Sequence, residues 1–428
     1  MGHILVDSRW QRPVDAPTLA RSKQLAAAHT DPQALLDAGI ADAYELAQFA
    51  ADDWRTRLTP RLSARAPSSL NSHRVRTQEA TVRIEAAGAV VVVDPGPNCR
   101  IADGADLIVI THAHHDHVGG LCEAAAASPR ARIALTAETL ELLLLSPESD
   151  ALRRLIDDRG SVMDANGEPM RMNDIDLRLH PAGHLLGAAM ADIAFDRAQG
   201  ARLLVTGDFA LRPLAEVPGA VWPNAEYDTV VMECTHAWDP DAPTADPVAN
   251  RRSIAAACES AAASGARTIV VDADSLGKAQ EAYVAVAEAQ MRGALPNWRL
   301  EWSGKAGQVA ELYRRAPHDR YSVWGPALRQ TQGLDFIADR RIVFAGALRP
   351  QQIDSLQQAG VHVLRPDDLT LHASFGELFA TAMALRCTRA VLYHGPVHSA
   401  DAAPPLMREL QRAGRQVTTA ERADAYFG

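Results

Sequence analysis

The stretch THAHHDHVGG, residues 111–120, places four of the chain's fifteen histidines and one aspartate within six positions. It directly follows the apolar run ADLIVI, residues 105–110, which is typical of a buried strand. Imidazole and carboxylate are ligands that zinc prefers in proteins. The alternative is a surface loop that happens to be polar, but four histidines directly after a buried strand strongly favour a metal site. This stretch therefore predicts an α/β fold built around a metal centre.

The spacing inside the stretch divides its side chains into two sets. Alternate side chains share one face of an extended segment, so His112 and His114 are expected to point the same way. Asp116 and His117 follow where the chain turns toward a helix, and they are expected to serve a second, adjacent cation. His115 is expected to point away from its neighbours, as a packing or solvent-facing histidine.

Three further candidate ligands follow predicted strands later in the chain. They are His184 in PAGHLLGAAM, Asp208 in LLVTGDFA and His394 in AVLYHGPVH. A single histidine after a strand is more often structural than a ligand, so each of these signals is weak alone. Together they complete a dinuclear site, in which a carboxylate at position 208 is suited to bridge two cations.

The order HxHxDH, GH and TGD resembles the metallo-β-lactamase superfamily, whose fold is an αββα sandwich. The segments AGHLLGAA, TGDF, MECT, LHASFGEL and LYHGPVHS narrow the resemblance. They are similar to the RNA- and DNA-processing branch that carries a β-CASP insertion, including ribonuclease J and the polyadenylation nuclease. The resemblance covers roughly residues 75–428.

The resemblance implies roles for nine residues and two zinc ions, with manganese as a possible substitute. The first zinc is held by His112, His114 and His184, the second by Asp116, His117 and His394, and Asp208 bridges the two. Glu233 is the acidic residue that orients a neighbour, and His372 is the catalytic histidine near the scissile phosphate. Read without the family, Glu233 and His372 have structural explanations as well.

The chain departs from that branch at several positions. Members often read ESTYG where this chain reads ECTHA at 233–237, so His236 either adds a contact to the site or is inert. Pro396 stands where the last histidine motif often carries a glutamate. These departures concern the substrate more than the metal chemistry.

The texture of the chain predicts four segments. Residues 1–70 are expected to form a helical extension, with Asp31 as an N-cap and Pro32 at the first helical position, and to offer a surface for a protein partner or a homo-oligomer. Residues 71–246 are the first part of the core. Residues 247–368 alternate helix and strand, as expected for a small parallel α/β insertion, and residues 369–428 complete the core.

Composition limits the function further. No apolar run reaches the ~18 residues of a membrane span, and no secretory signal is visible at the first residues. The five cysteines form no CxxC pair, which favours a reducing cytoplasm over a disulfide framework. The net charge of −10 means that nucleic acid would need a local basic groove or bound metal. Arg251, Arg252, Arg349 and Arg365 are candidates for such phosphate contacts.

These observations predict a zinc-dependent phosphodiester hydrolase, an exo- or endonuclease acting on single-stranded RNA or DNA through a hydroxide activated by two metals. In this prediction Asp116, Glu233 and His372 are the catalytic residues. One alternative is a hydrolase of a small lactone, thioester, other ester or cyclic phosphodiester, which the acidic charge favours. Another is a noncatalytic scaffold, against which the complete ligand set argues.

Overall fold

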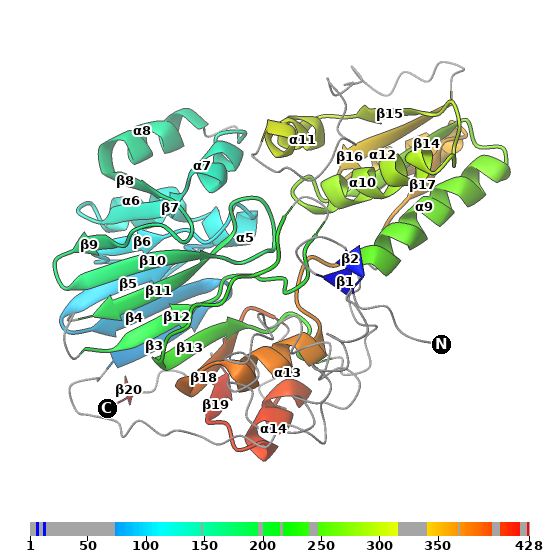
Figure 1. Cartoon of the computed structure of the whole chain (residues 1–428). Helices are drawn as coiled ribbons and strands as arrows, with labels where there is room; N and C mark the ends of the chain where they lie inside the picture. Colours follow the sequence, from blue (N-terminus) through cyan, green and yellow to red (C-terminus); the bar gives the residue numbers. More distant parts are fainter. Residues whose placement is uncertain are drawn as a thin grey trace.

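Two seven-stranded sheets lie face to face in the computed structural model, with helices on their outer faces (Figure 1). The structure describes residues 6–7, 12–13, 73–146, 149–195, 200–214, 217–238, 247–315, 340–366, 369–395, 403–419 and 426–427. The predicted α/β class is confirmed.

The first sheet has the strand order β20-β3-β4-β5-β6-β7-β8. Its strands β3 to β5 form an antiparallel meander, and β5 to β8 run parallel to one another. The bounds are β3 His73–Gln78, β4 Thr81–Ala86, β5 Ala89–Val93, β6 Leu107–Val109, β7 Arg132–Thr136, β8 Gly160–Met163 and β20 Tyr426–Phe427.

The second sheet has the order β19-β18-β13-β12-β11-β10-β9. Its strands β12, β13, β18 and β19 are parallel, so their carboxyl ends lie at one edge. The bounds are β9 Met170–Met172, β10 Ile175–Pro181, β11 Ala189–Phe195, β12 Arg202–Val205, β13 Tyr227–Glu233, β18 Cys387–Tyr393 and β19 Val417–Thr419.

Alternation along the strands builds the core between the two sheets. Val82 and Ile84 of β4 meet Leu177 of β10 and Ile193 of β11 in one fully buried cluster. The opposite faces are covered by helices, which are α5 His115–Val118, α6 Leu121–Ala127, α7 Ala137–Leu143 and α8 Ser149–Arg159 on the first sheet and α13 Phe375–Ala384 and α14 Pro405–Arg412 on the second (Figure 1).

A separate four-stranded sheet forms between β13 and α13 in the chain. Its order is β15-β16-β14-β17, and every neighbouring pair is parallel, as the alternating sequence pattern predicts. We call this part, residues 247–315 and 340–366, the inserted unit. Its elements are α9 Pro247–Ala263, β14 Thr268–Ala273, α10 Lys278–Met291, β15 Arg299–Trp302, α11 Lys305–Arg315, β16 Arg341–Gly346, α12 Pro350–Gln358 and β17 His362–Leu364.

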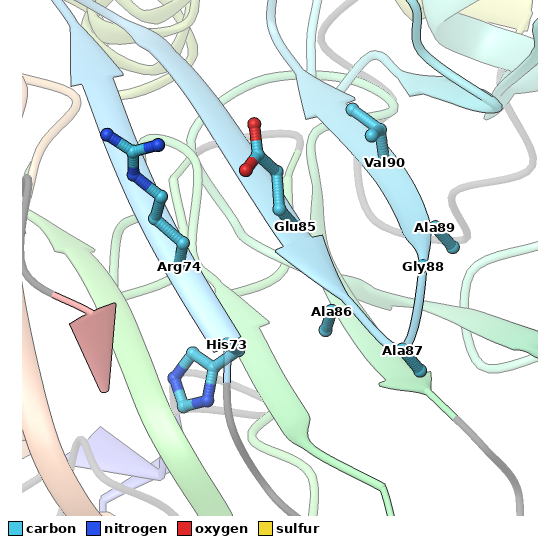
Figure 2. Close-up of a pocket in the computed structure, with 8 residues that line it drawn as sticks. All are labelled: His73, Arg74, Glu85, Ala86, Ala87, Gly88, Ala89 and Val90. Carbon is cyan, nitrogen blue, oxygen red and sulfur yellow. The ribbon is translucent and has the colours of Figure 1, made fainter. Parts of the chain in front are cut away.

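The helices expected within residues 1–70 lie outside the described residues. In that segment the structure describes β1 Val6–Asp7 and β2 Arg12–Pro13, which pair antiparallel. Among the described residues, no helix is long and apolar enough to cross a membrane. A surface pocket of about 320 Å³ lies beside the β4–β5 turn, lined by His73, Arg74 and residues 85–90, and holds none of the predicted site residues (Figure 2).

Candidate metal centre

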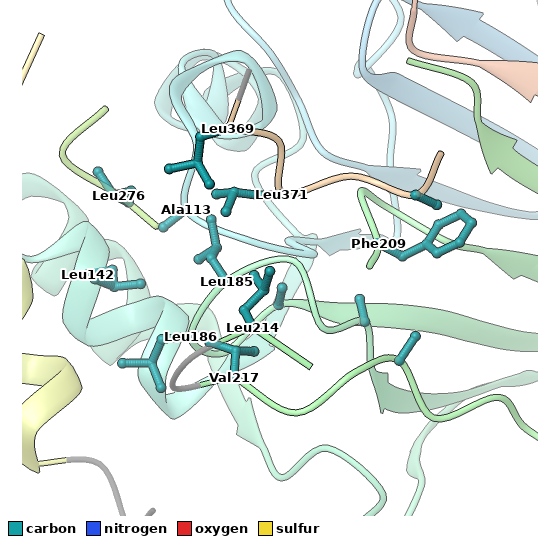
Figure 3. Close-up of a cluster of buried hydrophobic side chains, with 14 of the residues drawn as sticks. Ala113, Leu142, Leu185, Leu186, Phe209, Leu214, Val217, Leu276, Leu369 and Leu371 are labelled. Carbon is teal, nitrogen blue, oxygen red and sulfur yellow. The ribbon is translucent and has the colours of Figure 1, made fainter. Parts of the chain in front are cut away.

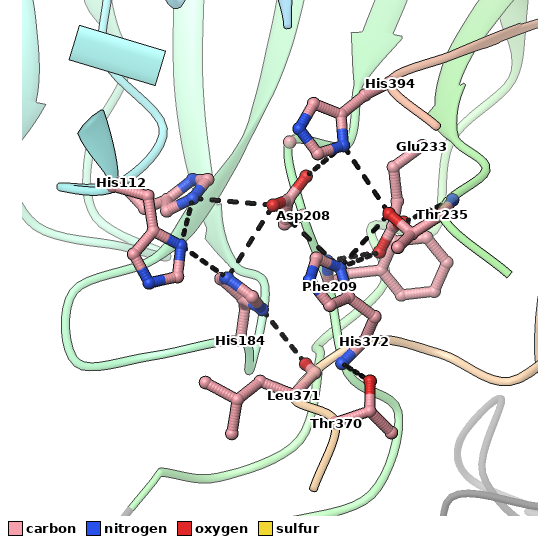
Figure 4. A network of polar contacts seen from close by, with 12 residues as sticks. His112, His184, Asp208, Phe209, Glu233, Thr235, Thr370, Leu371, His372 and His394 are labelled. Carbon is pink, nitrogen blue, oxygen red and sulfur yellow. Dashed lines mark hydrogen bonds and ion pairs between the residues drawn. The ribbon is translucent and has the colours of Figure 1, made fainter. Parts of the chain in front are cut away.

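Polar side chains follow the carboxyl ends of five strands, and these ends meet at one edge of the two sheets. Asp94 follows β5, His112 follows β6, and Asp208 follows β12, while Glu233 ends β13 and His394 follows β18. Figure 4 shows that residues from these distant segments point toward one another. The two sheets therefore bring together residues that lie far apart in the sequence, from Asp94 to His394.

His112, His114 and His184 form a group of three imidazoles, which we call the three-histidine group. The atom His114 Nδ1 lies 3.2 Å from His112 Nε2 and 3.0 Å from His184 Nε2. With the carboxylate of Asp208 they form one set of possible ligands whose donor atoms all lie within 4.8 Å of one another.

The outer ring nitrogen of each of these histidines identifies its tautomer. His184 Nδ1 lies 3.0 Å from the carbonyl oxygen of Leu371, which only accepts, so this nitrogen carries the proton. The Thr111 hydroxyl donates to Asp94 Oδ2 at 2.6 Å and therefore accepts from His112 Nδ1 at 3.0 Å. The inward nitrogens are left with lone pairs.

In His114 the outer nitrogen is Nε2, whereas in His112 and His184 it is Nδ1. Its Nε2 lies 3.3 Å from the Leu276 carbonyl oxygen and donates to it, so Nδ1 keeps a lone pair. Three lone pairs therefore face one another at 3.0–3.2 Å with no proton between them. Such contacts are repulsive until a cation occupies the space between them, and the three-histidine group thus fits a metal ion.

Asp116, His117 and His394 form a second possible ligand group, which we call the open group. His394 Nε2 lies 3.0 Å from Asp116 Oδ2 and 3.2 Å from His117 Nε2. His117 Nδ1 donates to Asp94 Oδ2 at 2.8 Å, which orients the ring with its Nε2 toward the centre of the site. The Asp116 side chain is 56% exposed, in contrast to the fully buried His117.

Asp208 lies between the two groups, and its Oδ2 is also 3.4 Å from His117 Nε2 of the open group. Its Oδ2 is 3.6 Å from His112 Nε2 and 3.7 Å from His184 Nε2, while Oδ1 is 3.3 Å from His394 Nδ1. Oδ1 is buried and accepts no hydrogen bond. A buried, unpaired carboxylate oxygen is costly, and a cation on each side would stabilise it. The donor set therefore fits two divalent ions with Asp208 between them.

Glu233 and His372 form a pair beside Asp208. Glu233 is fully buried and accepts hydrogen bonds from the backbone N–H groups of Phe209 and Thr235. His372 Nδ1 lies 3.2 Å from Glu233 Oε1 and donates to it, because the carboxylate only accepts. The Nε2 atom of His372 is thereby left for a substrate.

The pKa values of the histidines shift in opposite directions in the two ligand groups, because burial and nearby charges differ in their balance. Burial lowers the pKa of His112, His114 and His184, which keeps these imidazoles neutral, as metal ligands must be. Burial also acts to lower the pKa of His117, but Asp208 and Asp94 outweigh it, so the pKa is raised.

The remaining site residues follow the same balance. Burial acts against the charged forms of His394 and His372, but nearby carboxylates outweigh it and raise the pKa of both, with Asp208 acting on each. Burial acts to raise the pKa of Asp208, and the neighbouring histidines lower it well below its usual range. The open group and His372 therefore hold protons more strongly than the three-histidine group.

The structure adds Asp94 and Thr111 to the residues that the sequence singled out. Asp94 is fully buried, binds His117 directly, and reaches His112 through Thr111. Its φ of 52° and the φ of 50° at His394 lie in the left-handed region, a strain that functional sites often carry. The signal that would have found Asp94 is its place directly after the valine strand β5, the same strand-end position that marks the other ligands.

Other expected residues lie differently. His236 Nε2 is 2.9 Å from Thr370 Oγ1, which accepts from the His372 N–H, so His236 contacts the His372 loop. His115 is exposed. The expected phosphate contact is wrong for Arg251, which is buried and 3.3 Å from Glu281. Arg365 is 58% exposed and lies 3.3 Å from Asp272.

Comparison with known proteins gives two partial relatives, and no family model matches. A UPF0173 metal-dependent hydrolase of Aeropyrum pernix is 33% identical over 117 residues, which cover 24% of this chain and 48% of that protein. Transcription termination factor FttA of Methanothermobacter thermautotrophicus is 27% identical over 241 residues, covering 50% of this chain and 36% of that protein. The chain thus spans less than half the length of each relative. Both similarities support a relationship with the metallo-β-lactamase superfamily.

Proposed function

We propose that this protein is a two-metal phosphodiester hydrolase that cuts single-stranded RNA or DNA. In this proposal residues 71–246 and 369–428 form a metallo-β-lactamase sandwich, and residues 247–368 form a β-CASP-like insertion. The observation that carries the proposal is the convergence of three unprotonated imidazole nitrogens on one side of the buried Asp208 carboxylate, with Asp116, His117 and His394 grouped on its other side. The name of the Aeropyrum relative, a metal-dependent hydrolase, supports the reaction class.

Zinc is the ion that this set of imidazole and carboxylate donors suits best, with manganese as an alternative. His112, His114 and His184 would hold one ion, Asp116, His117 and His394 the other, and Asp208 both. When bound, the two ions supply Lewis acidity that activates water and neutralises charge on a phosphate group. The protein's part is to fix the ligands through Asp94, Thr111 and the Leu371 carbonyl.

His372 is the residue placed to move a proton in the reaction. Glu233 accepts from its Nδ1, and the negative charge of Glu233 acts to raise the pKa of His372, which favours the form with a proton on Nε2 as well. The side chain is 18% exposed, so a substrate can reach it. His372 would donate that proton to the leaving oxygen of the cleaved phosphodiester.

Lys278, the first residue of α10, favours an anionic substrate. Lys278 is half-buried. Its positive charge acts to lower the pKa of His372, so this charge is felt at the site. A phosphate group bound near His372 would gain from the charge of Lys278, whereas a neutral ester would not. This local positive charge offsets the net charge of −10 at the site where a polyanion must bind.

The test is a denaturing gel with end-labelled single-stranded RNA and DNA and protein loaded with zinc or manganese. We expect cleavage, with loss in Asp116→Ala and in His372→Ala, and the product ladder distinguishes end-on from internal cutting. Protein shown to hold its metals that cuts neither strand would contradict the proposal.

A small-molecule ester or cyclic phosphodiester is the second candidate substrate, because the net charge of −10 disfavours long polyanions. The same metal-loaded samples can be assayed on bis(p-nitrophenyl) phosphate and p-nitrophenyl acetate. Hydrolysis of these compounds without cleavage of either nucleic acid would favour the second candidate.

A further inference from the structure

We propose that the inserted unit is a positioning element of the metal centre, which holds the three-histidine group through the Leu276 carbonyl and the Tyr313 hydroxyl. This inference rests on the proposed metal centre. It goes further in that metal binding would depend on the contacts between the inserted unit and the segments that carry His114 and His184. It assigns a role to the turn at residues 274–278 and to one side of α11.

The first contact is the hydrogen bond from His114 Nε2 to the Leu276 carbonyl oxygen, 3.3 Å long. This bond selects the tautomer in which His114 Nδ1 carries the lone pair. The outer nitrogens of His112 and His184 are fixed by residues outside the inserted unit, Thr111 and Leu371. Within the three-histidine group, only the His114 ring has its described outer-nitrogen contact with the inserted unit.

The Leu276 side chain anchors the turn that carries this carbonyl. It is 7% exposed and belongs to the same hydrophobic cluster as Ala113, Leu185 and Leu371 (Figure 3). These three residues are chain neighbours of His114, His184 and His372. Apolar contact thus holds the turn against the segments that carry the site.

Gly277 makes the close approach possible. Its φ is +91°, and a Cβ built there would lie 2.4 Å from Leu371 Cδ1 and 3.8 Å from Leu185 Cβ. Both the backbone conformation and the available space therefore favour glycine. A side chain at this position must displace the buried Leu371 side chain or move the turn that carries the Leu276 carbonyl.

Tyr313 of α11 supplies the second contact, on a different segment of the site. Its hydroxyl oxygen accepts a hydrogen bond from the backbone N–H of Leu186, 3.1 Å long and buried. Leu186 lies two residues after His184. The inserted unit therefore contacts the segments of two of the three histidines, and its displacement would disturb both.

The experiment compares Gly277→Ala with Gly293→Ala in the full chain. Gly293 lies in the same unit with the same φ of +91°, but a Cβ there would meet nothing within 4 Å. Both variants place a Cβ at the same positive φ, and only the first has the clash. Zinc is titrated into the metal-free proteins against a chromogenic chelator, with far-UV circular dichroism and thermal unfolding as checks on folding.

We expect Gly277→Ala to bind one of its two zinc ions about 10- to 100-fold more weakly, the usual cost of losing an outer hydrogen bond to a ligand. Gly293→Ala should bind both ions as the wild type does. Tyr313→Phe, which removes only the hydroxyl, should weaken the same ion in the same direction, and it serves as the test if Gly277→Ala does not fold.

The other outcomes separate the two proposals. Wild-type affinity for both ions in Gly277→Ala and Tyr313→Phe would overturn the positioning role and leave the metal centre intact. Equal weakening in Gly293→Ala would assign the effect to backbone strain and would also overturn it. A wild-type protein that binds no zinc would overturn the metal centre and this inference together.

Discussion

Asp192 and Asp208 are two equally buried carboxylates of the second sheet, and their surroundings differ. Asp192, in β11, is 3% exposed and accepts two hydrogen bonds from Arg202, at 2.9 and 2.7 Å, and lies 3.4 Å from His180. Asp208, after β12, is 2% exposed, and its Oδ1 accepts no hydrogen bond. Both oxygens of Asp192 are thus satisfied by protein groups, whereas one oxygen of Asp208 is left without a hydrogen bond, where a cation would stabilise it.

At equal burial, a structural carboxylate and a candidate metal ligand differ in the partners of their oxygens. Arg202 supplies the fixed positive charge that Asp192 needs. Around Asp208 the neighbours are imidazoles, and those of the three-histidine group direct lone pairs inward. A mutation at Asp192 should therefore affect stability, and a mutation at Asp208 should affect metal binding.

The largest effect is expected for Asp208→Asn. The amide removes the charge shared by both metals, and two-metal sites contribute several kcal/mol to catalysis, so activity should fall by about a thousandfold or more. Zinc should raise the unfolding temperature of the wild type but not of this variant, because an ion stabilises only the state that binds it. Calorimetry with and without zinc measures this, and a variant still stabilised by zinc as strongly as the wild type would contradict the bridging role.

Asp94→Asn should have the next largest effect. Asp94 orients His117 directly and His112 through Thr111, and loss of such an outer partner typically weakens metal affinity by about 10- to 100-fold. Thr111→Val removes only the link to His112, so it should weaken the ion of the three-histidine group alone. Zinc titration of both variants tests this, and equal losses from the two would show that the ligand groups are not separately held.

Asp192→Asn should reduce the free energy of unfolding by about 1.5–3 kcal/mol, the range for hydrogen bonds to a charged group. Arg202 is 38% exposed, so water compensates part of the loss. Zinc binding and activity per folded molecule should equal those of the wild type. Urea denaturation measures the stability, and a loss of bound zinc in this variant would remove the distinction between the two carboxylates.

The smallest effect concerns the pH dependence of stability. Burial acts to raise the pKa of Asp192, but the hydrogen bonds from His180 and Arg202 outweigh it, so the pKa is lowered in the folded protein. Its stabilisation is therefore present above the unfolded value of about 3.9 and is lost as the pH falls through the folded pKa. The stability gap between wild type and Asp192→Asn should narrow between pH 7 and pH 3 in urea titrations, and a constant gap would contradict the assignment.

Much of the site could be predicted from sequence, because its ligands are side chains directly after strands. The parallel strands β12, β13 and β18 end at one edge, so the polar residue after each had to lie near the others. The structure brings the seven predicted ligands into two adjacent groups. Their roles as ligands stay predictions.

Other features of the site and of the inserted unit depend on contacts between distant residues, which no nearby sequence pattern indicates. The Leu276 carbonyl is a backbone group, so no residue type marks its approach to His114. Arg251 was expected at a phosphate groove, but it pairs with Glu281 on the neighbouring helix, a packing that the sequence pattern does not reveal.

The number of metal ions bound per chain is the most direct test of the proposed two-metal centre. Protein incubated with zinc and freed of excess would be measured by native mass spectrometry, beside Asp208→Asn and Asp192→Asn. We predict two ions per chain in the wild type and in Asp192→Asn, and loss of metal in Asp208→Asn. A wild-type chain that is folded and holds no zinc or manganese would contradict the proposed two-metal centre.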